Sequence, residues 1–166
     1  MWPSGIHASR KAWPEAYWVR LLLRLKALSF SLYLTGGAQD RAANAAFLSS
    51  HPNLQATSLA GEVSLTELAL LFQKASAVIS VNTGTMHLAA LCGAATVGLH
   101  GPTNPLRWGP YGPKVSALLP RRGDFGYLDL GFEYPKNYRP CLQHLWTEDV
   151  FAALKTLGVI DKTLPW

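Results

Sequence analysis

The sequence has few cysteines and few charged side chains, and both shortages limit the kind of protein it encodes. Its two cysteines, Cys92 and Cys141, are too few and too far apart for a disulfide framework, so we expect a reducing, cytoplasmic setting. Charged residues make up 15% of the chain and hydrophobic residues 49%, which is the balance of a packed core. We expect one folded domain over residues 1–166.

Long uncharged apolar runs are also missing. The most apolar stretch, residues 19–34, is interrupted by Arg20, Arg24 and Lys26, so we expect no membrane-spanning helix. Residues 1–5 have no apolar region of the kind that a secretory signal needs. Both absences favour a cytoplasmic protein, and they leave peripheral attachment to a membrane open.

Three motif classes are absent, and each absence excludes a function. Gly36 and Gly37 do not supply the G-x-G-x-x-G of dinucleotide oxidoreductases. The five histidines are scattered and no D-x-D occurs, so no metal or other cofactor is expected. No basic run exceeds two residues, which argues against nucleic acid. The net charge of +5 suits an anionic ligand, or simply a mildly basic soluble domain.

What the chain does contain is an alternation of helical and strand patterns, which predicts an α/β fold with a parallel sheet. Pro14 begins a helix, and Ser64 with Glu67 forms a capping box ahead of another. Thr147 is the expected N-cap of a last helix. The expected strands are residues 30–34, 54–59, 77–81 and 95–99, and an alanine-rich helix is expected over 40–49. Residues 100–140 show little periodicity except at 115–119.

Residues 77–99 predict a strand, a tight turn, a short helix and a second strand. The turn is Asn82-Thr83-Gly84, and the helix is expected from Thr85 to Leu91. Backbone N–H groups and the positive end of the helix dipole gather at such a helix start, so a diphosphate is a natural ligand there. Thr83, Gly84 and Thr85 are therefore candidate phosphate-binding residues, and a plain strand-to-helix cap is the alternative.

Four segments resemble glycosyltransferase family 9, the bacterial heptosyltransferases of the lipopolysaccharide inner core. They are K-A-W-P-E-A-Y-W at 11–18, N-T-G-T-M-H-L-A-A at 82–90, G-P-T-N-P-L-R-W-G-P at 101–110 and the closing residues 140–154. Any one of these is weak, but together they are specific. The resemblance implies a Rossmann-like doubly wound sheet, matching the C-terminal, donor-binding half of a GT-B glycosyltransferase.

The resemblance also implies function and partners. It implies binding of a nucleotide-sugar donor, ADP-heptose before others, for transfer to a lipopolysaccharide-core or other glycan acceptor at the inner face of the inner membrane. The acceptor half and its catalytic base have no counterpart in the matched segments, so an N-terminal-half partner chain is one way to complete an enzyme. A non-catalytic nucleotide-binding remnant or interaction module of the same fold is the competing interpretation.

Further site residues follow from the resemblance. Lys11 matches a family lysine that holds the donor phosphates. The loop before this lysine is shorter here than in the family, and Ser9 is the hydroxyl residue that remains in it as a candidate phosphate ligand. Asn82 stands where the family usually has Asp. The asparagine keeps an acceptor oxygen but lacks the negative charge. Gln39 falls near a Glu that contacts the nucleoside, and His87 faces phosphate or sugar, or is simply packed.

The segment at 101–110 has two interpretations. Either Arg107 binds an acidic acceptor beside the cleft, or Trp108 only fills the core.

Overall fold

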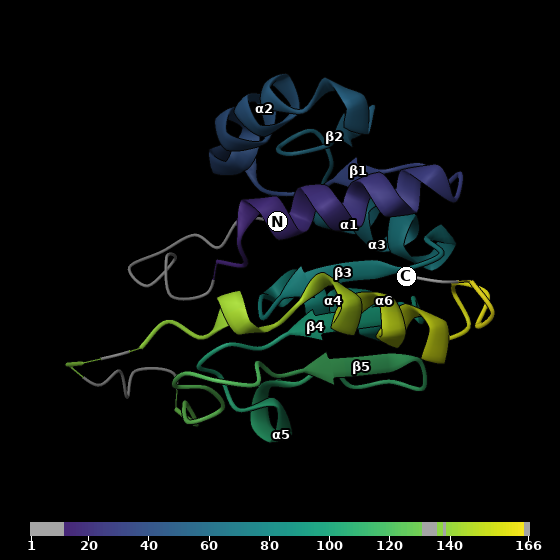
Figure 1. Ribbon diagram of the computed structural model, residues 1–166. Coiled ribbons are helices and arrows are strands. Elements are labelled where there is room, and N and C mark those ends of the chain that lie inside the picture. The colour runs from purple at the N-terminus through teal and green to yellow at the C-terminus, as the bar shows by residue number, and fades with distance from the viewer. Residues whose placement is uncertain (1–11, 131–135, 138, 165–166) are drawn as a thin grey trace.

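The computed structural model describes residues 12–130, 136–137 and 139–164 and shows a parallel α/β arrangement (Figure 1). The predicted α/β class is confirmed. Its strands are β1 (Tyr33–Leu34), β2 (Thr57–Ser58), β3 (Val78–Val81), β4 (Thr96–Leu99) and β5 (Val115–Leu118). Its helices are α1 (Glu15–Ala27), α2 (Arg41–Ser50), α3 (Leu65–Lys74), α4 (Gly84–Leu91), α5 (Pro105–Trp108) and α6 (Thr147–Thr156).

The larger sheet has three parallel strands in the order β3-β4-β5. Val78 is opposite Thr96, and Thr96 is opposite Val115 on the other side, so β4 is the central strand. All four residues of β4 are buried because helices cover both of its faces. Gly98 permits the close approach of α4, since a Cβ atom there would lie 2.6 Å from the Met86 sulfur.

The smaller sheet pairs β1 with β2, also in parallel. Within the described residues β1 is not hydrogen-bonded to β3, so the doubly wound sheet is present in two separate parts. The short 3-10 turn Ala38–Asp40 follows β1 and leads into α2.

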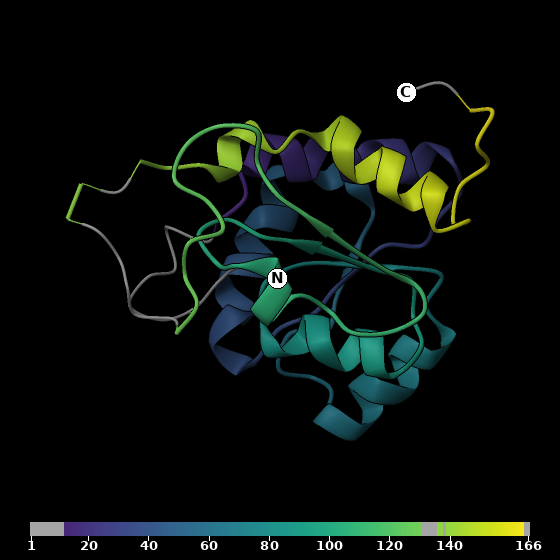
Figure 2. The ribbon, with the colours of Figure 1, turned by 90° about the horizontal axis from the view of Figure 1, so that it is seen from below.

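Helices lie on both sides of the larger sheet. Figure 2 shows α1 and α6 side by side on one face and α3 with α4 on the other. Trp13, just before α1, is buried, and its indole N–H donates to the Leu145 carbonyl oxygen at 2.8 Å. This bond fixes the start of α1 to the segment before α6. The main core forms between these helices and the strands they cover.

The helix boundaries mostly follow the predicted signals. Ser64 Oγ accepts from the Glu67 N–H at 3.2 Å, and the Glu67 carboxylate accepts from the Ser64 N–H at 2.8 Å, so the predicted capping box is confirmed. The prediction for α6 was wrong by one residue. Trp146 is the N-cap, with its N–H donating to Asp149 Oδ2, and Thr147 is buried in the first turn.

The one-turn helix α5 was missed. Its signal was Asn104, whose side chain accepts from the Leu106 N–H, followed by Pro105 at the first helical position. A single turn carries too little periodicity to stand out in a loop rich in glycine and proline. Among the described helices, none is both long and apolar enough to cross a membrane.

Candidate functional site

The carboxyl ends of β3 and β4 lie at one edge of the larger sheet, on the left in Figure 1, and α4 begins directly after β3. Thr83 is the N-cap of α4, with extended backbone at φ −143°. The Met86 N–H donates to the Thr83 carbonyl oxygen at 3.1 Å, which closes the first turn. The structure thus places Asn82, Thr83, Gly84 and Thr85 together at this edge, as predicted.

Gly84 is exposed on this turn. A Cβ atom built on it would have nothing within 4 Å, and its φ is not positive. The glycine is therefore not required by left-handed backbone, and no neighbouring side chain crowds it. What it leaves is open space directly over the start of a helix, where N–H groups lack intrahelical acceptors.

A buried serine, which the sequence analysis missed, holds Thr83 in place. Ser80 Oγ donates to the Val81 carbonyl oxygen at 2.8 Å and lies 3.2 Å from Thr83 Oγ1. A hydroxyl has one proton, so the Thr83 hydroxyl is the donor in the second bond. The Thr83 proton is thereby directed inward, towards Ser80. The sequence did carry a signal for this role, because Ser80 is a polar residue inside an otherwise apolar strand.

Thr85 and His87 continue along α4, and both are half-buried. Thr85 borders a cavity of about 710 Å³ that lies between β1 and β3. His87 also lowers, through its charge, the pKa of a second histidine, His100, which directly follows β4.

His100 was also missed, although a histidine at the carboxyl end of an apolar run was a readable signal. It is fully buried, its Nδ1 is 3.2 Å from Thr103 Oγ1, and its Nε2 has no partner among the described residues. Burial, together with the charge of His87, lowers the pKa of His100 to about 4, against a smaller raising effect of Thr103. His100 is therefore a neutral ring within the protein at neutral pH.

Gln39 reaches the same edge from the smaller sheet. It is exposed on the turn after β1, and its amide is folded over Gly37. The Gly37 N–H donates to the Asp40 carboxylate at 2.9 Å, which fixes the turn. Lys11 and Ser9, the other predicted phosphate ligands, lie outside the described residues.

Backbone bonds tie together distant parts of the loop region after β4. The Gly126 N–H donates to the Gly101 carbonyl oxygen and the Leu128 N–H to that of Pro102. Trp108 is only half-buried and its indole donates to the Asp129 carbonyl oxygen, so its core-filling alternative was wrong. Arg107 remains exposed beside it.

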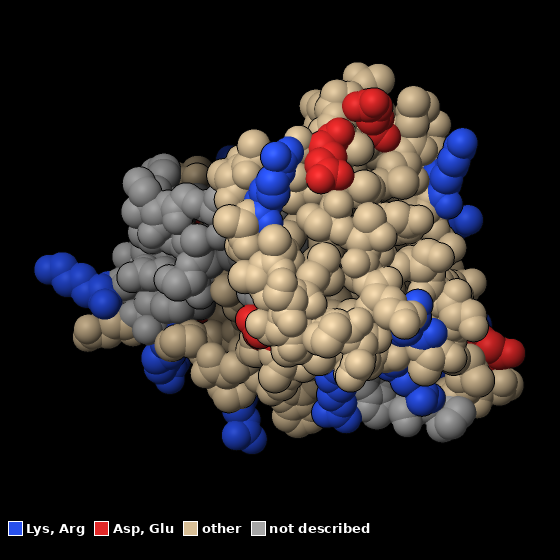
Figure 3. Space-filling model, turned by 90° about the horizontal axis from the view of Figure 1, so that it is seen from above, with Lys and Arg blue, Asp and Glu red and all other residues tan. Residues whose placement is uncertain are grey.

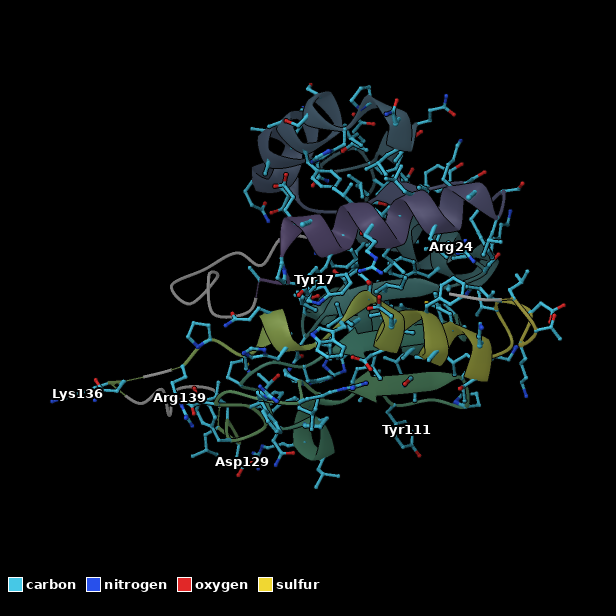
Figure 4. All side chains as sticks on the ribbon, in the orientation of Figure 1. Tyr17, Arg24, Tyr111, Asp129, Lys136 and Arg139 are labelled. Atoms are coloured by element: carbon cyan, nitrogen blue, oxygen red, sulfur yellow. The ribbon has the colours of Figure 1, made fainter. Side chains whose placement is uncertain are left out.

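A second link in this loop joins Asp124 to Arg139, and the bonds from Arg139 hold the pKa of the Asp124 carboxyl below its usual range. Figure 4 shows Arg139 and Asp129 in this loop region, while Tyr111 points away from the body of the molecule.

On the face that carries α2, the Lys and Arg side chains of the described residues do not gather into one patch. Figure 3 shows Lys and Arg side chains spread around the margin of the face that carries α2, with the acids fewer. Among the residues that the structure describes, no group of three or more His, Cys, Asp or Glu side chains converges as metal ligands would.

Comparison with known proteins identifies the protein family to which this chain belongs. The family model of glycosyltransferase family 9 (heptosyltransferase) matches residues 3–125, and the chain belongs to this family. The resemblance noted in the sequence motifs is confirmed.

Among its relatives is lipopolysaccharide heptosyltransferase 1 of Pseudomonas aeruginosa, 36% identical over 82% of this chain and 34% of that relative. Lipopolysaccharide heptosyltransferase 2 of Salmonella typhimurium is 29% identical over 62% of this chain and 30% of that relative. The chain thus spans about a third of the length of these curated relatives.

Solved structures give the same fold. The ADP-heptose heptosyltransferase II of Escherichia coli superposes with a TM-score of 0.75 at 23% identity, over 93% of this chain and 44% of that one. The E. coli heptosyltransferase WaaC with ADP superposes with a TM-score of 0.72 at 23% identity, over 93% and 42%. These likenesses support the predicted correspondence to part of a GT-B enzyme.

Proposed function

We propose that this chain is the donor-binding part of a heptosyltransferase and holds the diphosphate of an ADP-heptose-like sugar nucleotide at the start of α4. The observation that carries this proposal is the open space over Gly84, at a helix start bracketed by the carboxyl ends of β3 and β4. Ligands of parallel α/β sheets bind beyond such strand ends. One solved relative is named as an ADP-heptose heptosyltransferase and another is a heptosyltransferase solved with ADP, and both support this choice of ligand.

The helix start alone is too weak to bind a nucleotide. A helix dipole contributes about 0.3–1 kcal/mol, whereas micromolar binding needs about 8 kcal/mol. Hydrogen bonds to charged groups, at roughly 1.5–3 kcal/mol each, supply the remainder. We assign these to the backbone N–H groups of Gly84 and Thr85 and to Lys11, with Ser9 beside it, by the resemblance of 11–18 to the family motif.

The other site residues face the sugar and the nucleoside in this proposal. Asn82 offers an amide to sugar hydroxyls where relatives carry a carboxylate. His87 is one turn into α4, close enough to the helix start to meet phosphate or sugar. Gln39, on the turn after β1, contacts the nucleoside. No metal or cofactor takes part in this scheme.

Transfer of the sugar to a lipopolysaccharide-core acceptor needs more than these residues. The acceptor hydroxyl must come within about 3–3.5 Å of the anomeric carbon, with a base in reach. The candidate residues lie on the donor side only. We therefore propose that residues 1–166 form one donor domain, and that an acceptor domain faces it across a cleft at the cytoplasmic face of the inner membrane. That domain comes from the same polypeptide or from a partner chain.

Thermal unfolding with added nucleotides tests the binding proposal. Ligand at a hundred times its dissociation constant adds about 2.7 kcal/mol of stability. For a chain of this size that is a rise in Tm of roughly 5–11 °C. ADP and ADP-sugar should raise Tm more than UDP, and adenosine should raise it least. A Tm unmoved by millimolar ADP contradicts the proposal.

A transfer assay tests the rest. The chain alone should not transfer heptose from ADP-heptose to a core acceptor, and a separately produced N-terminal half of a relative should restore transfer. Rapid transfer by the chain alone would contradict the need for an acceptor domain. ADP binding with no transfer in any combination would instead favour the non-catalytic nucleotide-binding module.

A further inference from the structure

The helix α4 begins at Thr83, a residue of the type that usually caps a helix start with its own side chain. A capping threonine accepts, through its hydroxyl oxygen, a hydrogen bond from the backbone N–H of the second or third helical residue. In α4 these are Thr85 and Met86. The Thr83 side chain makes no such bond within the described residues, although its extended backbone, at φ −143° and ψ 167°, suits an N-cap residue. The cap is therefore absent because of the direction of the side chain and not because of the backbone.

Two other helix starts in the same chain carry the usual cap. At α3, Ser64 Oγ accepts from the Glu67 N–H at 3.2 Å, and at α5 the Asn104 side chain accepts from the Leu106 N–H at 3.0 Å. Such a cap stabilises a helix, and replacing it by alanine lowers the stability of the protein. The start of α4 thus forgoes a stabilising bond at the place where a ligand is proposed. Local losses of stability of this kind are expected at functional sites.

Ser80 accounts for the direction of the Thr83 side chain. It is the third residue of β3, it is 2% exposed, and its Oγ lies 3.2 Å from Thr83 Oγ1. The Ser80 proton is used in the 2.8 Å bond to the Val81 carbonyl oxygen, so Ser80 Oγ accepts the Thr83 proton. If Thr83 turned to cap α4, the buried Ser80 oxygen would lose this bond. The bond therefore holds the Thr83 side chain against the end of β3.

A capping oxygen and a ligand oxygen compete for the same place. Both lie over the first turn of a helix and accept hydrogen bonds from its backbone N–H groups. A threonine hydroxyl in that place would occupy these donors, and a phosphate would have to displace it. With Thr83 turned towards Ser80, the space over Gly84 stays open, and a Cβ atom built on Gly84 has nothing within 4 Å.

We infer that Ser80 is a positioning residue for phosphate binding, which holds the Thr83 hydroxyl away from the start of α4 and so keeps the helix N–H groups available to the ligand. This inference rests on the proposed function, because it assigns a role within the same diphosphate site. Ser80 is buried and acts through Thr83 rather than by contact with the ligand. The free protein then has no cap to break at α4 before it binds.

Titration calorimetry with ADP on the full chain tests this role in Ser80→Ala. Without the serine hydroxyl, Thr83 needs only a rotation about χ1 to cap α4, and ADP must then displace its side chain. From the strength of threonine caps in other proteins, ADP should bind about 2- to 30-fold more weakly than to the unmodified chain. Adenosine, which has no phosphate, should keep its affinity, and its binding shows that the variant is folded.

A double-mutant cycle distinguishes positioning from a general structural effect. Thr83→Val keeps the shape of the side chain and removes the hydroxyl that could cap α4. Ser80→Ala should therefore weaken ADP binding when Thr83 is present, and should weaken it no further in the Thr83→Val chain. A serine whose loss only loosened β3 would lower the ADP affinity by the same factor in both chains, and that result would overturn the inference.

The rotamer of Thr83 gives a second readout that needs no variant. Three-bond NMR couplings to the Thr83 methyl carbon report χ1, and the unmodified chain should show one rotamer that is the same with and without ADP. In Ser80→Ala without ADP, the couplings should change to those of a hydroxyl that faces the Met86 N–H. A capping rotamer in the free, unmodified chain would overturn the inference, and this measurement decides the question even if Ser80→Ala fails to fold.

The outcomes also separate this inference from the proposed function. If the unmodified chain binds ADP and Ser80→Ala binds it equally tightly, the role of Ser80 is wrong and the diphosphate site stands. If the unmodified chain does not bind millimolar ADP, both are wrong. Tighter ADP binding by Ser80→Ala would mean that the released Thr83 hydroxyl donates to the phosphate, and it would overturn the inference as well.

Discussion

Gly84→Ala separates the ligand-binding role of the α4 start from its structural role. The added Cβ atom has nothing within 4 Å, and the backbone there needs no positive φ, so the free protein should accept it. Replacing a glycine at a compatible position stabilises a protein by about 0.4–1 kcal/mol, through the unfolded chain. We expect Tm of the free protein to stay the same or rise by about 1–4 °C.

Ligand binding should move in the opposite direction. If ADP approaches the backbone at Gly84, a methyl group stands between the phosphates and the N–H groups. Losing one charge-assisted hydrogen bond costs roughly 1.5–3 kcal/mol, which is about a 10- to 150-fold rise in Kd. Titration calorimetry with ADP measures this directly, and adenosine, which has no phosphate, should lose little affinity.

Gly93→Ala is the control at the other end of the same helix. A Cβ atom at Gly93 also has nothing within 4 Å, but its φ of +83° strains any side chain. We expect this variant to lose about 1–2 kcal/mol of stability and to keep its ADP affinity. If Gly84→Ala binds ADP as tightly as the unmodified chain, the diphosphate does not sit at the start of α4, and the reasoning fails.

Three further predictions follow from single residues. Lys11→Ala should weaken ADP binding more than adenosine binding in calorimetry, because only ADP presents phosphate charge, and equal losses would make Lys11 a surface lysine. Asn82→Asp should leave ADP affinity nearly unchanged and strengthen binding of an intact ADP-sugar, whose hydroxyls donate to a carboxylate; weaker sugar-nucleotide binding would contradict the assigned role. The pKa of His100 is lowered from 6.5 to about 4 in the folded protein, so between these pH values the unfolded chain binds a proton that the folded protein does not. The free energy of unfolding should therefore fall as pH drops from 6.5 to 4, by up to about 3 kcal/mol. Urea unfolding across that range should show this slope reduced in His100→Asn, and an unchanged slope would assign it to other groups.

Local signals in the sequence predicted most of the elements. The capping box of Ser64, the stripe of α1 and the turn from Asn82 to Gly84 each depend on residues close together in the chain. Such patterns directly report helix starts and buried faces. The missed α5 and the shifted start of α6 are one-residue or one-turn details that periodicity does not resolve.

The site was only partly predictable, for a different reason. Thr83 and Gly84 were predicted as site residues because a motif surrounds them, but the bond from Thr83 to Ser80 depends on hydroxyl directions that no pattern encodes. The burial of His100 depends on what covers the end of β4. The cavity between β1 and β3 is a property of strand pairing between distant segments, and a sequence pattern gives strands without giving their neighbours.

The bond from Trp13 to Leu145 spans 132 positions of the chain and has a consequence for synthesis. Ribosomes add roughly 5–20 residues per second, so Trp13 waits about 7–26 s for its partner to be made. Until then α1 has no α6 to pack against, and its apolar side remains available to chaperones. Docking of α1 is therefore a late event on the ribosome, and the burial of the Trp13 indole, read by its fluorescence, marks the moment when the two ends of the domain come together.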